Sequence, residues 1–493
     1  MKFIGWMYDI AREQSPREDN LRSMLESSLE AGYNAVGFYL EHRFAYRNAP
    51  WAEGDGCLQP GVVRQVTAEF RGEGLRIIPF LNILGHMEGF IRSEGGQFLA
   101  EGATQGSGQM CPSKPENIAF AEGLIDSALE SFDDEWVHLG GDETNQLGQC
   151  ELCSARAERI GKDGIYADYF VPMCEKIVRL GKRPCLWGDM LIEYPSILDR
   201  LPKETIIFDW HYAESPAEST KMFRDKGFDV VCCPAVRSYD SFFCHLRETW
   251  ENVDTHAKAA GDLDALGVLV TTWEFQFFTN YESTLPIVYS AGRRLSSGMG
   301  WEEALLASSL PEYVQMANAM GIKAEDASPF LAWPGWRRLR QAFVLSQNPF
   351  FLWRDWRGEV CGEVGDKLLA ICAPFESSSH EIAYPAILLA TSVRWVRAAE
   401  TAYLTYTDCR PQRAAELLAE SAALFDAIES IAVESAKRGG SAADVERAKL
   451  LRSRILTASE RIRSLGEYLP AFETITHPGY VAGDQAAWRT GQY

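Results

Sequence analysis

The stretch that decides the fold is Trp136-Val137-His138-Leu139-Gly140-Gly141-Asp142-Glu143. Its first four residues form a short apolar run typical of a buried strand, and the two glycines let the chain turn sharply where that strand ends. Neighbouring side chains on a strand point to opposite faces, but past the strand end that alternation relaxes. The segment therefore predicts a strand that places two adjacent carboxylates, Asp142 and Glu143, in one pocket.

Similar apolar runs recur along the first 300 residues and alternate with amphipathic, helix-like segments. The expected strands are Phe3–Tyr8, Ala35–Leu40, Arg76–Leu81, Trp136–Gly140, Arg183–Trp187, Thr205–Trp210, Asp229–Cys233 and Gly267–Trp273. Eight strand-then-helix units predict a (β/α)8 TIM barrel over residues 1–300. Such barrels carry their active sites at the carboxyl ends of the strands, where the acidic pair falls.

The pattern changes from residue 301, where strand-like runs disappear. Apolar residues at three- and four-residue spacing predict long helices over Ile382–Tyr403, Pro411–Lys437 and Ala442–Leu469. Residues 301–493 are therefore expected to form an α-helical C-terminal domain, whose apolar stripes make its own core or the surface of a homodimer. Four tryptophans in this region are either packing residues or a sugar platform: Trp333, Trp336, Trp353 and Trp356.

Composition narrows the function further. The chain has 493 residues, a net charge of −21 and a pI near 4.9. Such an acidic chain is a poor partner for nucleic acid and is repelled by anionic membrane surfaces. The N-terminal segment reaches Asp9 too early for a signal-peptide core, and no apolar run approaches the ~20 residues of a membrane helix. The expected location is the cytoplasm.

The chain contains 12 cysteines, which in this setting are expected to be mostly buried free thiols. Cys150-Glu151-Leu152-Cys153 has the spacing of a metal or redox pair. A zinc site would need two more ligands, for which Cys111, Cys174 and Cys185 are the possible sources. The alternative, a plain pair of thiols, is the favoured interpretation.

Two acids held close together do not ionise alike, because each raises the pKa of the other. Cleavage of a glycosidic bond needs such a split between a proton donor and a charged partner. The pair at Asp142 and Glu143 is therefore suited to glycoside chemistry. The alternative is that these residues only cap the helix that follows.

The segment His138-x-Gly140-Gly141-Asp142-Glu143 resembles the signature of glycoside hydrolase family 20, the β-N-acetylhexosaminidases. Gly5-Trp6-Met7-Tyr8-Asp9-Ile10-Ala11-Arg12 is similar to the family's first barrel strand. Ile78-Pro79-Phe80-Leu81-Asn82-Ile83-Leu84-Gly85-His86 is similar to its third. The resemblance covers about residues 1 to 300. It is greatest to the hexosaminidase D-like members, which lack the non-catalytic domain that often precedes the barrel.

The resemblance implies substrate-assisted catalysis, in which the 2-acetamido oxygen of the substrate attacks the anomeric carbon and forms an oxazolinium intermediate. Glu143 matches the general acid and is expected to be buried and protonated beside a charged Asp142. Asp142 matches the residue that orients the acetamide N–H. Tyr239 is expected to donate a hydrogen bond to the attacking oxygen.

The remaining expected roles concern binding and support. Trp187, Trp210 and Trp273 would enclose the acetamide methyl, although each tryptophan alone is more often core. Residues expected at the sugar hydroxyls or beside the pocket are Asp240, Glu274, Glu41 and Asp189, the last with helix capping as an equal alternative. His86 and His138 resemble support residues that tune the general acid, and a lone strand histidine is otherwise a satisfied core residue.

Several positions depart from the family pattern. Ile4 stands where the family has the arginine that grips the sugar 3- and 4-hydroxyls, and Phe80 and Asn82 replace acidic residues of strand three. Trp273-Glu274 is one residue tighter than the family's Trp-x-Glu. Arg12 or Arg43 is expected to bind these hydroxyls in place of the missing arginine.

The leading hypothesis is an exo-acting β-N-acetylhexosaminidase that removes terminal GlcNAc and/or GalNAc from a glycan or glycoside, with no cofactor and no metal. One alternative is a non-catalytic or altered-specificity sugar-binding barrel. A metal-dependent hydrolase is disfavoured, because the 8 histidines include no His-x-His or His-Glu-x-x-His motif.

Overall fold

The computed structural model describes residues 1–12, 14–102, 107–239, 241–273, 278, 281–327 and 360–465. Two compact units share the chain. The first comprises Met1–Arg237, Glu248–Trp273 and Val288–Ser308. The second comprises Ser238–Arg247, Glu274–Ile287 and Ser309–Tyr493. No helix within the described ranges has both the length and the apolar character needed to cross a membrane.

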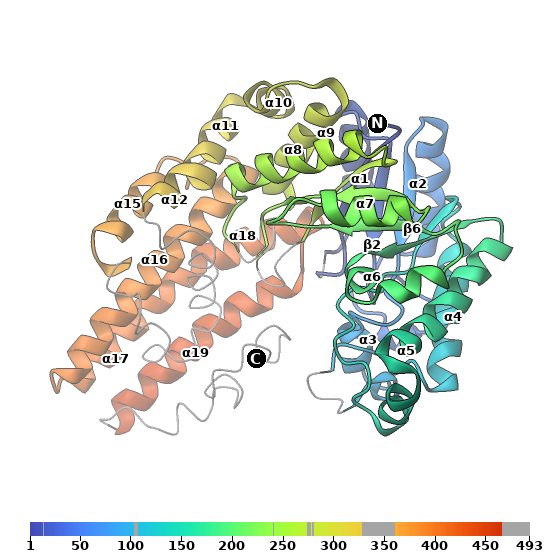
Figure 1. Cartoon of the computed structure of the whole chain (residues 1–493). Helices are drawn as coiled ribbons and strands as arrows, with labels where there is room; N and C mark the ends of the chain where they lie inside the picture. The colour runs from blue at the N-terminus through green and yellow to red at the C-terminus, as the bar shows by residue number, and fades with distance from the viewer. Residues whose placement is uncertain are drawn as a thin grey trace. The chain divides into compact units, whose positions relative to one another are not determined.

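The first unit is a closed barrel of eight parallel strands, as predicted (Figure 1). Its strands are β1 (Phe3–Asp9), β2 (Ala35–Tyr39), β3 (Arg76–Phe80), β4 (Trp136–His138), β5 (Arg183–Trp187), β6 (Ile206–Trp210), β7 (Asp229–Cys233) and β9 (Gly267–Thr272). Pairing of Phe3 with Gly267 and of Trp6 with Val270 brings β1 against β9 and closes the ring. A two-residue strand, β8 (Ala235–Val236), pairs with the end of β9.

Helices connect the strands and cover the barrel, as expected for alternating β and α segments. The principal ones are α1 (Glu18–Glu30), α2 (Pro60–Gly72), α4 (Pro115–Leu129), α5 (Glu151–Arg179), α7 (Ala217–Asp225) and α8 (Leu246–Asp262). The barrel interior is filled by large apolar side chains from successive strands, including Phe3, Met7, Phe80, Trp136, Trp187 and Phe208. The interior is thus a packed core, which leaves the carboxyl-terminal rim to carry chemistry.

The second unit is helical in its described part. Its helices include α11 (Pro311–Asn318), α15 (Glu363–Cys372), α16 (His380–Thr407), α17 (Pro411–Ser421), α18 (Phe425–Lys437) and α19 (Ala443–Leu465). The expectation of one continuous helix over Pro411–Lys437 is wrong, because a 3-10 turn at Ala422–Leu424 separates α17 from α18. Phe425, the first residue of α18, packs against Trp395 of α16 with ring centroids 5.7 Å apart. No glycine or proline marks the break, so periodicity alone gave no signal for it.

Candidate active site

The turn after β4 presents the acidic pair, and it depends on two glycines. Gly140 and Gly141 have φ values of 75° and 94°, in the left-handed region that side chains other than glycine rarely occupy. A Cβ atom on Gly141 would lie 2.5 Å from the Tyr166 hydroxyl, which donates a hydrogen bond to the Gly141 carbonyl at 2.8 Å. The turn therefore cannot accept larger residues, and it aims Asp142 and Glu143 away from the strand.

Asp142, His86 and Glu143 form one charged group at the end of the barrel. His86 Nε2 lies 3.2 Å from Asp142 Oδ2 and 3.5 Å from Glu143 Oε2. Burial lowers the pKa of His86, but the charge and hydrogen bond of Asp142 raise it further, so the net pKa lies well above its ordinary value. A protonated His86 therefore forms an ion pair with the Asp142 carboxylate.

The two carboxylates differ in environment. Asp142 is buried, and its Oδ1 has no hydrogen-bond partner among the described residues. The Glu143 side chain is 55% exposed, so the expectation that it is buried beside Asp142 is wrong. The cause is local: Glu143 has a φ of 47°, one residue past the buried Asp142, and this left-handed step leaves its side chain in solvent.

Asp189 holds Glu143 in place through the backbone. It is the first residue of α6 (Asp189–Glu193), directly after β5, and its Oδ2 accepts the Glu143 amide N–H at 2.8 Å. Burial, assisted by the charge of Asp142, raises the pKa of Asp189 to about 7. Of the two roles open to Asp189, its side chain thus contacts the loop of the acidic pair.

A second charged group lies at the ends of β1 and β2. The guanidinium of Arg12 is 2.7 Å from Glu41 Oε1 and 3.6 Å from Asp9 Oδ1. Burial raises the pKa of Glu41 to about 7 against the opposing effect of Arg12, with Glu88 adding to the rise. Glu88 begins α3 (Glu88–Arg92) and was not predicted as a site residue.

Of the two arginines proposed as a sugar grip, only Arg12 is placed beside these acids. Arg43 is buried and donates hydrogen bonds to the carbonyls of Gln14 and Asp55, at 3.1 Å and 3.0 Å. Arg43 therefore holds the loop between β2 and α2. Arg12 keeps 18% of its side chain exposed and lies over the rings of Tyr39 and Trp273, 5.5 Å and 5.7 Å from their centroids.

Aromatic residues line the rim next to Arg12. Trp273 lies edge-on to Tyr39, with centroids 4.9 Å apart, and its indole N–H donates to the Tyr212 hydroxyl at 2.5 Å. Tyr212 stacks on Trp210 at 5.1 Å. Sequence reasoning missed Tyr212, although it stands two residues past β6, in Trp210-His211-Tyr212. The ring centroid of Trp187 lies 6.1 Å from that of Trp273, but Trp187 is fully buried in the barrel core.

Residues 53–263 match the family model described as "Glycosyl hydrolase family 20, catalytic domain". This part of the chain is similar to the catalytic domain of glycosyl hydrolase family 20. The matched residues include β3 to β7 and the acidic pair.

Relatives carry hexosaminidase names. The chain is 23% identical over 199 residues to "Beta-hexosaminidase 1" of Coccidioides posadasii, covering 36% of this chain and 32% of that protein. It is 21% identical over 290 residues to "Hexosaminidase D" of Bos taurus, covering 52% and 80%. The chain thus spans about a third of the length of the first relative and most of the second. The solved structure of a Flavobacterium johnsoniae chitobiase matches 92% of this chain and 78% of its own, with 14% identity and a TM-score of 0.52, which shows a shared fold.

The other predicted site residues are placed differently. His138 is fully buried, and its Nδ1 accepts the Gly140 amide N–H at 3.0 Å. Burial lowers its pKa well below the ordinary value, so it is a neutral residue that shapes the turn. Its described hydrogen bond reaches neither carboxylate of the pair. Tyr239 belongs to the second compact unit, and its role stays a prediction.

Some predicted residues lie outside the described residues. These are Asp240, Glu274 and the tryptophans Trp333, Trp336, Trp353 and Trp356.

Proposed function

We propose that this protein is an exo-acting β-N-acetylhexosaminidase that removes terminal β-linked GlcNAc and/or GalNAc by substrate-assisted, retaining catalysis. The observation that carries the proposal is the hydrogen-bonding environment of Asp142, which lies in the segment that matches the family 20 catalytic-domain model. One of its oxygens is held by His86 at 3.2 Å, and the other is buried with no partner in the described part of the chain. A buried carboxylate oxygen without a partner is a strong acceptor that is available to a hydrogen-bond donor of a ligand.

The acetamide N–H of the substrate is such a donor. Its hydrogen bond to Asp142 Oδ1 would turn the acetamide oxygen toward the anomeric carbon. As that oxygen attacks, the acetamide nitrogen gains positive charge, which the Asp142 anion offsets. The oxazolinium that results is then opened by water, so the anomeric configuration is retained.

Glu143 supplies the proton for the leaving oxygen. Its carboxyl is exposed in the free protein, where an aglycone is able to reach it. A bound sugar that covers this carboxyl removes it from water and favours its neutral, proton-donating form. The Asp189 contact to its amide fixes the position from which it donates.

The aromatic rim and Arg12 would bind the sugar. Trp273 and Trp210 offer flat apolar faces for the acetamide methyl and the pyranose ring, and Tyr212 carries a hydroxyl between them. Ile4 is buried in the barrel and offers no donor, so Arg12 is the cation placed to reach the sugar hydroxyls. Arg12 lies at a different position from the arginine expected at residue 4. This supports an altered preference among sugars that differ at the 3- and 4-hydroxyls.

The proposal is tested with Glu143→Gln and Asp142→Asn on aryl N-acetyl-β-glucosaminides and galactosaminides. Glu143→Gln should lower kcat about 10²- to 10⁴-fold on poor leaving groups, but much less on leaving groups that need no proton. Asp142→Asn should slow the chemical step on both. A wild-type chain that binds N-acetylglucosamine without hydrolysing any of these glycosides would instead support the sugar-binding alternative.

A further inference from the structure

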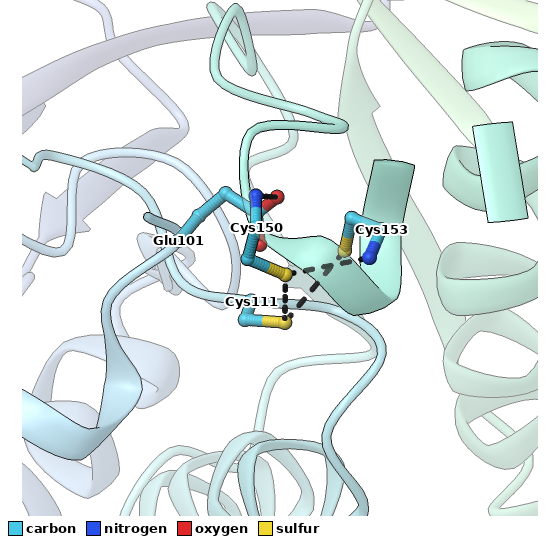
Figure 2. Close-up of side chains that lie close together, drawn as sticks. All are labelled: Glu101, Cys111, Cys150 and Cys153. Carbon is cyan, nitrogen blue, oxygen red and sulfur yellow. Dashed lines mark hydrogen bonds between the residues drawn. The ribbon is translucent and has the colours of Figure 1, made fainter. Parts of the chain in front are cut away.

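Three cysteines and one glutamate form a compact cluster that the proposed activity does not use (Figure 2). The ligand atoms of Glu101, Cys111, Cys150 and Cys153 all lie within 4.8 Å of one another. The sulfur of Cys111 is 3.5 Å from that of Cys150 and 3.6 Å from that of Cys153. All three cysteines are free thiols in the structure.

These distances match four ligands around a single ion. Tetrahedral zinc with Zn–S bonds of about 2.3 Å separates its sulfur ligands by about 3.8 Å. The distances from the Cys111 sulfur to the sulfurs of Cys150 and Cys153 are within a few tenths of an ångström of that value. They are too close to enclose an iron–sulfur cluster, whose own sulfide atoms push the protein thiolates further apart.

Glu101 provides independent evidence for a bound cation. Its side chain is fully buried, and Oε1 accepts the amide N–H groups of Gln149 and Cys150 at 2.9 Å and 3.0 Å. Its Oε2 has no hydrogen bond of ordinary geometry among the described residues, and no ion pair described in the structure includes this carboxylate. A fully buried carboxylate without a cation is unfavourable, and a divalent ion would satisfy it.

Hydrogen bonds orient the sulfurs of Cys150 and Cys153. Cys150 is the N-cap of α5, and its Sγ accepts the Cys153 amide N–H at 3.3 Å. The Ser113 hydroxyl lies 3.0 Å from Cys153 Sγ and accepts from Arg156 at 3.0 Å, which brings a cation next to the cluster.

Hydrogen bonds hold the residues around Glu101 and around Cys111 in place. An antiparallel bridge pairs Ala100 with Met110, and the Cys111 amide donates to the Leu99 carbonyl at 2.8 Å. The Asn117 side chain donates to the carbonyls of Leu99 and Cys111. The cluster is therefore preorganised from two separate loops, as metal sites require.

We infer that Glu101, Cys111, Cys150 and Cys153 bind one structural zinc ion. Thiolates with a single carboxylate in a tetrahedral set favour zinc over magnesium or calcium, which prefer all-oxygen sites. Four protein ligands leave no open position, so the ion has a structural role. Cys174 and Cys185, the other cysteines considered from sequence, do not belong to the cluster.

The ion would clip together the two loops that carry the acidic pair and its histidine. Glu101 and Cys111 follow β3 and His86, whereas Cys150 and Cys153 follow β4 and Glu143. Two hydrogen bonds already join the same loops, from the Gly108 amide to the Gln146 side chain and from the Gln146 amide to the Gln109 side chain. The proposed ion would add a further connection between them. This inference does not depend on the proposed glycosidase activity.

The first test is the metal content of the full-length protein. After growth with added zinc and purification under reducing conditions, elemental analysis should find about one zinc per chain. Chelation should lower Tm, and readdition of zinc should restore it. Reduced protein that contains no zinc and takes up neither zinc nor cobalt would overturn the inference, as would a Cys111–Cys150 disulfide in the isolated protein.

The second test compares two cysteines of the same helix. Cys153→Ser should lose the zinc and the sulfur-to-cobalt charge-transfer absorption of the cobalt-substituted protein. Cys174→Ser changes another buried thiol of α5 and should keep both. Loss of the metal in Cys174→Ser, or full zinc in Cys153→Ser, would contradict the assignment.

Should Cys153→Ser fail to fold, Ser113→Ala leaves all four ligands in place. It removes a hydrogen bond to the Cys153 sulfur and should weaken zinc about 10- to 100-fold in competition with a chelator. Unchanged zinc affinity in this variant would contradict the outer part of the proposed site.

Discussion

The contact between Asp189 and the Glu143 amide leads to a quantitative prediction. Glu143 has a φ of 47°, and for a residue other than glycine this conformation costs on the order of 1–3 kcal/mol. The Asp189 carboxylate accepts the Glu143 N–H at 2.8 Å and stabilises that conformation. Replacing Asp189 with alanine removes the acceptor and lets the Glu143 backbone relax.

The magnitude follows from the strength of one hydrogen bond. A charged acceptor paired with a backbone amide contributes about 1.5–3 kcal/mol. If the productive conformation of Glu143 loses that much, kcat should fall about 10- to 150-fold above pH 7, where Asp189 is ionised. KM should change little, because the Glu143 amide is not expected to contact the sugar. Asp189 acts here as a positioning residue.

Asp189→Asn is the informative partner variant. An asparagine oxygen still accepts the amide N–H without charge, so its loss should be about fivefold or less. Because the pKa of Asp189 is about 7, the wild-type side chain is itself largely neutral at pH 6. Asp189→Asn should therefore match wild type at pH 6 and fall behind only as the pH rises above 7.

The assay is steady-state hydrolysis of an aryl N-acetyl-β-glucosaminide with a poor leaving group, between pH 5 and 8. Glu193→Ala, at the other end of α6, is the control and should keep wild-type kcat. A kcat for Asp189→Ala within twofold of wild type would refute the reasoning. Equal losses in the alanine and asparagine variants at pH 6 would refute it as well.

Three further predictions concern the rim. His86→Gln should lower kcat at least tenfold and move the alkaline limb of the kcat profile, because the raised pKa of His86 supports the Asp142 anion. Tyr212→Phe keeps the ring on Trp210 but removes the hydroxyl, and should lower kcat more than it raises KM. The folded-state pKa of Glu41, about 7, lies above its ordinary 4.5, so this carboxyl stabilises the fold fully below pH 4.5 and loses that contribution as the pH rises through 7. Glutamine resembles the neutral carboxyl, so Glu41→Gln should match the Tm of wild type below pH 4.5 and exceed it increasingly as the pH rises through 7 in thermal melts; a constant difference would contradict the assignment.

The barrel could be predicted from the sequence because its strands are buried on both faces and bounded by turn residues. Arg183–Trp187 and Asp229–Cys233 were predicted with the bounds the structure shows. The break at Ala422–Leu424 could not be predicted, because a change of pitch over three residues leaves apolar spacing almost unchanged.

Site residues that directly follow a strand could be predicted from the sequence. Contacts that depend on folding to bring distant residues together could not. The pairing of His86 with Asp142 joins two predicted residues, but the exposure of Glu143 depends on its backbone angle, which no residue type reveals. Glu88 begins a short helix in a loop, and only the fold brings its charge to bear on Glu41. The cysteine cluster shows the same limit, since Cys111 joins Cys150 and Cys153 only through the packing of two loops.

Dependence on the acetamide group tests the central claim most directly. Wild-type protein is assayed with an aryl N-acetyl-β-glucosaminide and with the aryl β-glucoside that differs only at the 2-position. If the Asp142 anion directs the substrate's own acetamide as the nucleophile, the first should be hydrolysed and the second should show no turnover above background. Comparable hydrolysis of both substrates would contradict the account, because it would require the protein to supply the nucleophile.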